Sequence, residues 1–210
     1  FDFVGVRAVS LLSSGLFSNT VSMGDEFFGF RDPHGEFDEN EEVQNFFTES
    51  AKLLLKRLQD SNFPLEAHEM LTYYCALQTG VLYSEWMPEE KKFNFKSFPA
   101  TCCRLAEDSA GKVRTIFREF EMTAHQAYEK WGNKCPKCVI DKAMKPAEMY
   151  NKEKFFHAVF KREGRDSTMK NKENKEYVSY YVHIDEEEII EEGGYDSFPY
   201  ATPRFFKKSG

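Results

Sequence analysis

The spacing of apolar residues predicts three helices within the first eighty positions. Residues 4–17 and 40–59 place apolar side chains at helical intervals, and Asp2 precedes the first segment as a possible N-terminal cap. The second segment has acidic residues in its first turn and basic residues in its last turn, a polarity that suits the helix dipole. Its large apolar side chains, which we expect to contact the core, are Phe46, Phe47, Leu54, Leu55 and Leu58.

A third helix is predicted over residues 65–79. The sequence Asn62-Phe63-Pro64 supplies a polar residue and an early proline, which are typical of a helix start. Gly80 stands where a left-handed C-terminal cap is favoured. Because the connection to the preceding helix is short, we expect the two helices to form an antiparallel hairpin.

Short strands are predicted mainly beyond Gly80, where the helical spacing ends. The earlier aromatic run at residues 27–30 fits a buried strand, and with the breaker sequence at 32–35 it predicts a loop or an edge element. Alternating side chains at 112–120 indicate a strand with two working faces. The full set of expected later strands is 81–86, 93–98, 112–120, 155–161, 177–184 and 188–192.

Two local motifs connect these strands. Residues 108–111 read Asp-Ser-Ala-Gly, a turn sequence, so residues 101–120 are expected to form a hairpin. Thr123 and Gln126 have the spacing of a capping box, which predicts a helix over residues 124–131 that ends at Gly132. The polar stretch 166–175 is expected to be a mobile loop between two strands.

The elements together predict an α+β protein in which N-terminal helices pack on a mixed, mainly antiparallel sheet. We expect a helical part over residues 1–80 and a β-rich part over residues 81–210 with one or two short helices. The chain starts at Phe1 without an initiator Met, and residues 207–210 carry no closing element. Both ends are therefore interpreted as cuts within a longer protein.

Charge and composition limit the classes of function. The net charge of −7 argues against a surface that neutralises many phosphates of duplex DNA, because such affinity comes mainly from Lys and Arg. No apolar run approaches the length of a membrane span, so we expect no membrane partner. Five cysteines, an odd number in a chain of 210 residues, suit a reducing compartment better than a disulfide framework.

Cys135 and Cys138 form the one local motif with possible metal chemistry, because two thiolates at this spacing can share one zinc ion. A structural zinc needs two more ligands, and Cys102 and Cys103 would point to opposite faces if both lie on a strand. The more common interpretation is two ordinary thiols at the start of a helix. We therefore expect no cofactor.

Other candidate chemistry has simpler explanations. The five histidines are scattered and most of them are expected to be surface or capping residues, and the acidic run 185–188 is expected to be a solvated turn. Aromatic residues alternate with lysines at 91–96, which could stack single-stranded bases but better suits a half-buried edge strand. The sequence contains no nucleophile motif or phosphate-binding loop. We expect no enzyme activity.

Three blocks in order resemble the head-to-tail connector, or portal, proteins of short-tailed bacteriophages. The first is the small-residue helix 8–16 with Phe27-Phe28 downstream, and the second is 113–123 with Gln126, Trp131 and Gly132. The third joins 192–200 to Pro203-Arg204-Phe205 and Ser209-Gly210. Phe205 stands where the family often has Trp, and Cys135 and Cys138 match no feature of that family.

The resemblance implies a structural subunit of a DNA-conducting ring, and this chain would form much of its outer wing. It implies that such subunits form a ring, typically a dodecamer, through which DNA is packaged and ejected. It also implies capsid, packaging motor and tail proteins as partners, a place in the virion, and assembly in the cytoplasm of the bacterial host. Stem, clip and channel loop would follow residue 210.

The site residues that we expect are architectural. Gly193, Gly194, Pro199, Pro203 and Arg204 are expected in a tight turn and an extended segment that crosses into the stem, and Arg118 and Trp131 in strand-to-helix packing. One alternative is a zinc-stabilised nucleic-acid-binding module that uses Cys135, Cys138 and residues 91–96. An enzyme of unrecognised type is a second alternative.

Overall fold

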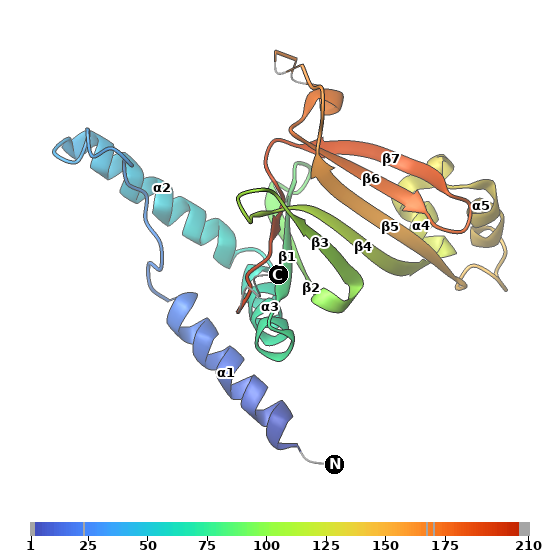
Figure 1. The fold of residues 1–210 in the computed structure, drawn as a ribbon, viewed down its shortest axis with the longest axis horizontal. Coiled ribbons are helices and arrows are strands. Elements are labelled where there is room, and N and C mark those ends of the chain that lie inside the picture. Colours follow the sequence, from blue (N-terminus) through green and yellow to red (C-terminus); the bar gives the residue numbers. More distant parts are fainter. Residues whose placement is uncertain (1–2, 23, 167, 170, 206–210) are drawn as a thin grey trace. The chain divides into compact units, whose positions relative to one another are not determined.

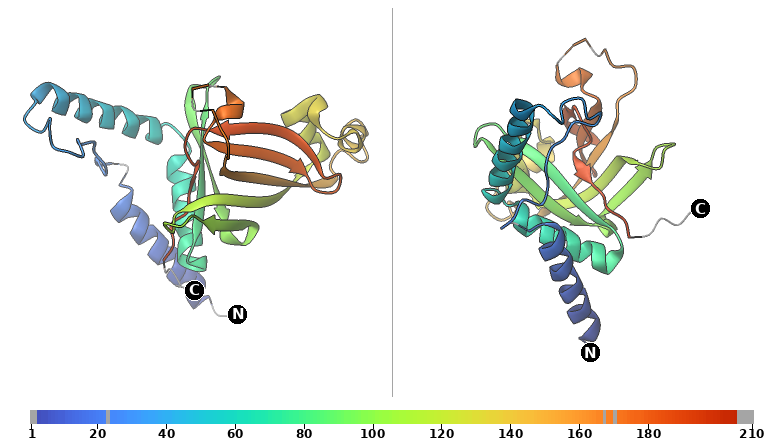
Figure 2. Two further views of the ribbon diagram at one scale, coloured as in Figure 1. Left: turned by 45° about the horizontal axis from the view of Figure 1, so that its top comes forward. Right: turned by 90° about the vertical axis from the view of Figure 1, so that its left-hand side faces the viewer.

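A computed structural model describes residues 3–22, 24–166, 168–169 and 171–205 (Figures 1 and 2). The chain divides into two units. Unit 1 comprises Phe1–Ala100 with Tyr200–Gly210, and unit 2 comprises Thr101–Pro199. Asp2, expected as a helix cap, and Ser209-Gly210, part of the third resemblance block, lie outside the described residues.

Three helices begin unit 1: α1 (Val4–Thr20), α2 (Glu41–Gln59) and α3 (Phe63–Leu77). The side chain of Asn40 accepts hydrogen bonds from the backbone N–H groups of Glu42 and Val43, which explains why α2 begins there. All three predicted helices are confirmed, and α1 extends three residues beyond the predicted end. None of the described helices is both long and apolar enough to cross a membrane.

The expected end of α3 was wrong. Gln78, with φ of +62°, forms the left-handed cap, and Gly80 instead begins the first strand. A Cβ atom built at Gly80 would lie 2.5 Å from the carbonyl oxygen of Met70. Glycine is required at position 80 because α3 approaches the strand closely, which is a tertiary cause and not a helix cap.

A three-stranded antiparallel sheet completes unit 1. Its strands lie in the order β2 (Lys92–Pro99), β1 (Gly80–Met87) and β8 (Tyr200–Ala201). α3 packs on β1 and β2, and α1 packs on α3. α2 meets α3 mainly near their connecting turn, and Figure 2 shows their axes diverging, so the predicted antiparallel hairpin was wrong.

Unit 2 is a five-stranded antiparallel meander in which each strand pairs with the next along the chain. Two helices, α4 (Ala124–Trp131) and α5 (Lys137–Ala143), lie between the second and third strands in sequence (Figure 1). The strands are β3 (Cys103–Glu107), β4 (Val113–Thr123), β5 (Lys152–Lys161), β6 (Tyr177–His183) and β7 (Glu188–Tyr195). Short 3-10 turns are η1 (Ala100–Cys102), η2 (Gly132–Lys134) and η3 (Lys172–Asn174).

The predicted capping box starts α4. The Thr123 side chain accepts a hydrogen bond from the Gln126 backbone N–H at 3.2 Å, and the Thr123 N–H donates to Gln126 Oε1 at 3.0 Å. Gly132 ends the helix with φ of +55°. Both predictions are confirmed, because capping depends on side chains within four positions of each other.

The core of unit 2 lies where α4 and α5 cover one face of the sheet. Trp131 packs on the rings of Phe155 and Tyr181 at centroid distances of 5.2 and 5.3 Å. The buried members of this cluster are Ala124, Ala127, Trp131, Cys135, Val139, Ala143, Phe155 and Ile190. Burial of one such large side chain contributes on the order of 2 kcal/mol, so the cluster holds the helices on the sheet.

The α+β class is confirmed, and the strands form two sheets that pair antiparallel throughout the described residues. Residues 27–30 form a loop, one of the two predicted alternatives, and the fit to a buried strand was wrong because this segment has no ladder partner. Its rings instead contact one another, with Phe28 centroids 5.1 Å from Phe27 and 6.0 Å from Phe30. A local aromatic cluster produced the apolar signal.

Candidate assembly surfaces and a buried charged cluster

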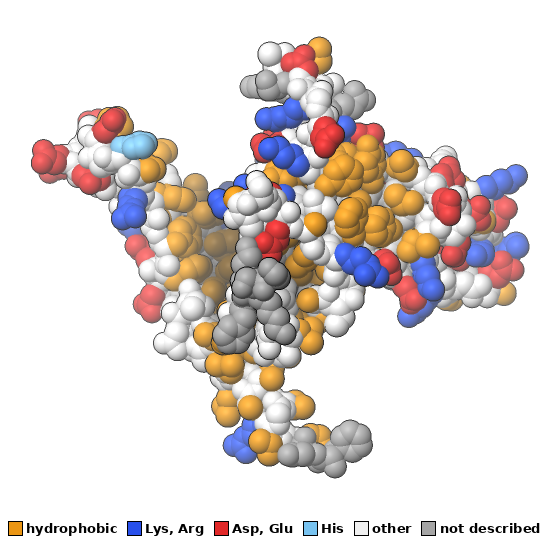
Figure 3. Space-filling view, viewed as in Figure 1, with side chains coloured by type: hydrophobic (Ala, Val, Ile, Leu, Met, Phe, Trp, Pro, Cys, Tyr) orange, Lys and Arg blue, Asp and Glu red, His pale blue; other side chains and the backbone are white. Residues whose placement is uncertain are grey.

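α1 exposes most of its apolar side chains. Val6 is 70% exposed and Leu11 66% exposed, and Ser13 is the one buried residue of the helix. Figure 3 shows hydrophobic side chains along this helix. Because large exposed apolar patches are typical of interaction sites, α1 is a candidate assembly surface.

α2 and the loop before it form an acidic, phenylalanine-rich segment. Residues 24–49 contain nine Asp or Glu residues, one Arg and six Phe residues. The other 184 residues hold 26 acidic and 27 basic side chains, so the net negative charge of the chain resides in this segment. Phe46 was expected in the core but is 67% exposed. The segment therefore presents both charge and apolar area to its surroundings.

One face of the unit 2 sheet carries a row of half-buried aromatic side chains. Strand register places Phe117, Phe156, Phe160 and Tyr180 on the same face, opposite the side chains that contact α4 and α5. Phe117 and Phe156 stack with centroids 5.5 Å apart, and Phe160 lies 6.1 Å from Tyr180. Figure 3 shows hydrophobic side chains gathered over these strands.

The opposite face holds a buried histidine. His157 is 1% exposed, stacks on Tyr181 with centroids 4.1 Å apart, and shares a 2.9 Å hydrogen bond with Ser179. Burial, followed by the positive charges of Arg118 and Lys130, lowers the pKa of His157 to about 3. The imidazole is neutral at physiological pH. His157 is therefore an exception to the expectation that most histidines lie at the surface or at caps.

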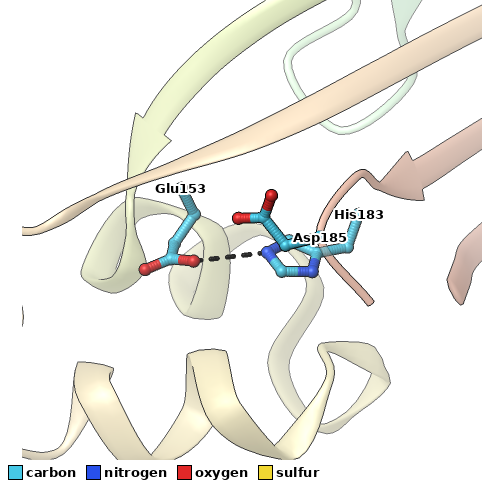
Figure 4. Close-up of side chains that lie close together, drawn as sticks. All are labelled: Glu153, His183 and Asp185. Carbon is cyan, nitrogen blue, oxygen red and sulfur yellow. Dashed lines mark hydrogen bonds and ion pairs between the residues drawn. The ribbon is translucent and has the colours of Figure 1, made fainter. Parts of the chain in front are cut away.

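A second buried histidine belongs to the cluster in Figure 4. His183 Nδ1 accepts the Glu186 backbone N–H at 3.3 Å, so Nε2 carries the proton and donates to Glu153 Oε2 at 3.3 Å. Lys142 donates to Glu153 Oε1 at 2.7 Å. Glu153 is 3% exposed and His183 is 1% exposed, so these bonds satisfy a buried carboxylate.

The same cluster is the one group of three potential metal ligands among the described residues. The ligand atoms of Glu153, His183 and Asp185 lie within 4.8 Å of one another. A cation bound there would have to displace the Lys142 ammonium from Glu153 and reverse the tautomer of His183. The donor set is already charge-compensated, and its geometry favours a structural role that joins α5, β5 and β6.

Cys135 and Cys138 do not meet in a common site. The Cys135 thiol is buried in the core and donates to the Ala127 carbonyl oxygen at 3.4 Å. Cys138 hydrogen-bonds the Glu186 carboxylate, and burial, with that bond second, raises its pKa. Neither cysteine belongs to the metal-ligand group found in the described part of the chain. Both thiols flank the start of α5, as predicted for ordinary cysteines.

The architectural residues predicted from the resemblance fall in different places. Gly193 and Gly194 lie within β7, so the predicted tight turn was wrong there. A Cβ at Gly194 would lie 2.7 Å from Lys175 Cβ and 2.9 Å from two backbone oxygens, whereas Gly193 has ordinary space. Pro199 is buried immediately before β8.

The other predicted residues have clear contacts. Arg204 forms an isolated antiparallel bridge with Thr79, next to the half-buried Pro203. Trp131 Nε1 donates to Glu191 Oε2 at 3.2 Å. The Arg118 guanidinium lies 4.1 Å above the Phe120 ring, at the margin of the core that Trp131 fills.

Comparison with known proteins identifies the class. A model of the family described as bacteriophage head to tail connecting protein matches residues 1–210, and the chain belongs to this family. It is 25% identical over 207 residues to a probable portal protein of Bordetella phage BPP-1 and 23% identical over 206 residues to the portal protein of Salmonella phage epsilon15. Each match covers 97% of this chain and 37% of the relative.

Proposed function

We propose that this chain is part of a portal subunit, a structural protein whose copies assemble into a closed ring. The observation that carries the proposal is the family match over all 210 residues. The two curated relatives bear the name portal protein. The chain spans just over a third of the length of these relatives, so each relative contains further segments that this chain does not match.

The exposed apolar side chains of α1 and α2 support an assembling subunit. Val6, Leu11 and Phe46 would each remain in water in an isolated chain. Large exposed apolar patches are rare on monomeric proteins and are usually covered by a partner. In a ring, a neighbouring copy supplies that cover through a heterologous interface, which closes when the rotation between subunits closes.

The same proposal extends to the remaining partners. The ring contains twelve copies, encloses an axial channel for DNA, and contacts capsid, packaging motor and tail proteins. It assembles in the bacterial cytoplasm and remains in the virion. The net charge of −7 is compatible with DNA that slides through without strong phosphate binding.

The test uses the full-length gene product that contains this chain. Native mass spectrometry and negative-stain microscopy are expected to show closed rings with a central channel. The double variant Val6→Gln with Leu11→Gln is expected to reduce the fraction of protein in rings while the melting temperature of the subunit stays unchanged. Met144→Gln is the matched control, because Met144 is 60% exposed but lies outside α1 and α2.

Two results would distinguish a failure of the portal proposal from a failure of the proposed role of α1. Single subunits at every protein concentration and salt concentration would refute the portal proposal itself. If the double variant forms rings as well as the unmodified protein, the portal proposal stands and the role of α1 in the ring interface is refuted.

A further inference from the structure

Cys102 and Cys103 lie closer together than their sequence suggested. Side chains of consecutive residues point to opposite faces only when both residues are extended. Cys102 ends the 3-10 turn η1 and Cys103 begins β3, so the alternation does not apply between them. The two Sγ atoms are 3.7 Å apart and share a hydrogen bond. The expectation of divergent thiols held only for two residues on one strand, and Cys102 lies outside the strand.

The thiol pair is partly exposed and lies next to a small cavity. Both cysteines are half-buried, and they line a cavity of about 100 Å³ together with Arg104, Phe117 and Phe156. All of these residues belong to unit 2. Strand register places Cys103 on the face of Arg118, opposite Arg104 and Phe117, so the cavity borders the backbone of the pair and the sulfur atoms are reached through their own partial exposure.

The raised pKa of Cys103 limits the reactions that the thiol pair can undergo. Burial, followed by the neighbouring Cys102 thiol, raises the pKa of Cys103 to about 12. Attack on disulfides or alkylating reagents requires a thiolate, so the Cys103 thiol is a poor nucleophile at neutral pH. Reactions in which two protonated thiols condense with one acceptor do not need that ionisation.

We propose that Cys102 and Cys103 form a chelating dithiol site that takes one trivalent arsenical. In the reaction two As–S bonds form, the As–O bonds of the oxide break, and the two thiol protons leave in one molecule of water. No electrons are transferred, so no oxidant or reductant is needed. A single arsenic atom requires two sulfur atoms close to van der Waals contact, and these two already lie 3.7 Å apart.

The other three cysteines provide internal controls. Cys135 donates to the Ala127 carbonyl oxygen and Cys138 bonds Glu186, so these two thiols are directed at different partners. Cys75 lies on α3 in unit 1. The structure therefore predicts one chelating pair among the five free cysteines.

Phenylarsine oxide is the probe, added to the reduced 210-residue chain. Native mass spectrometry is expected to show one adduct per chain that survives excess β-mercaptoethanol and is removed by dimercaptopropanol. Cys102→Ser and Cys103→Ser are each expected to weaken binding roughly a hundredfold or more, the scale by which two linked contacts exceed one. Cys75→Ser and the double variant Cys135→Ser with Cys138→Ser are expected to retain it.

A second measurement on the unmodified sequence guards against variants that fail to fold. After the arsenical binds, alkylation in denaturant at alkaline pH and peptide mapping are expected to find Cys102 and Cys103 protected and the other three cysteines modified, whereas the arsenical-free chain treated in the same way is modified at all five. An adduct that β-mercaptoethanol removes would overturn the proposal. Protection of Cys135 and Cys138 instead would also overturn it. Neither outcome depends on ring formation, so the test is independent of the portal proposal.

Discussion

The helices of the two units bury very different shares of their residues. α1 and α2, with 17 and 19 residues, each contain one buried residue. α4 and α5, with eight and seven residues, bury five between them: Ala124, Ala127, Trp131, Val139 and Ala143. The short helices complete a core within the chain, whereas the long helices expose apolar surface that the chain itself does not cover.

This difference separates two kinds of apolar residue that look alike in sequence. Trp131 and Phe46 both lie on amphipathic helices, but Trp131 is 5% exposed and Phe46 is 67% exposed. The first stabilises the fold of the subunit. Phe46 is exposed in this chain, so its ring could be buried only when the subunit binds another protein surface. Mutations should therefore affect stability in unit 2 and association in unit 1.

The largest expected effect is at Trp131. Trp131→Ala should lower the free energy of unfolding by about 3–5 kcal/mol, because it leaves a cavity between α4 and the sheet. Phe46→Ala, the matched change at an exposed ring, should stay within about 0.5 kcal/mol. Denaturant unfolding followed by far-UV circular dichroism measures both. Equal losses of unfolding free energy in the two variants would contradict the distinction between the buried helix α4 and the exposed helix α2.

Acid should destabilise the chain through His157. The imidazole pKa is about 3 in the folded chain and near its ordinary 6.5 in the unfolded chain, so acid favours the unfolded state between these values. The contribution of His157 to the free energy of unfolding is fully present above pH 6.5. It falls by about 2 kcal/mol between pH 6.5 and pH 5, and it stops falling below pH 3. His157→Gln should remove this component from the stability profile, whereas the exposed His125→Gln should retain it.

Adjacent glycines in β7 should respond differently to the same change. Gly194→Ala brings its Cβ against Lys175 and two backbone oxygens, and should cost about 1–3 kcal/mol through overpacking. Gly193→Ala meets the Ser179 side chain at 3.8 Å, an ordinary contact, and should be tolerated. Thermal unfolding of the two variants decides the matter. A loss at Gly193 that matches the loss at Gly194 would contradict this account of the strand.

The smallest effect is expected at the start of α4. Thr123→Ala removes the side chain that accepts the Gln126 N–H and should cost about 1 kcal/mol. Thr48→Ala is the control, because Thr48 lies inside α2 and its hydroxyl bonds only the Gln44 carbonyl oxygen in the same helix. That control should be neutral or slightly stabilising, since alanine favours helix. Both changes can be followed by chemical denaturation.

Local patterns predicted much of this fold because their causes are local. The limits of α4 were predicted exactly from Thr123, Gln126 and Gly132, which interact within one short segment. Most strands were predicted from alternation. The end of α3 was misplaced because Gly80 is required by the approach of Met70, a contact that no neighbouring residue reveals.

The buried polar sites were harder to predict. His157 lies two positions from Phe155 on the same face of β5, so alternation contained a signal that this histidine is buried. The proximity of the Cys102 and Cys103 thiols was not predicted, because it depends on Cys102 lying in a 3-10 turn outside the strand. The pairing of Glu153 with Lys142 and His183 joins three elements, and such convergence follows from tertiary structure alone.

The most direct test of the central claim is amide hydrogen exchange on the full-length gene product, compared between isolated subunits and the assembled form. The account predicts that amides of α1 and α2 exchange quickly in subunits and become protected on assembly, while amides of α4 and α5 are protected in both. Unchanged exchange in α1 and α2 on assembly would show that these helices are not the surfaces that copies of the subunit bury.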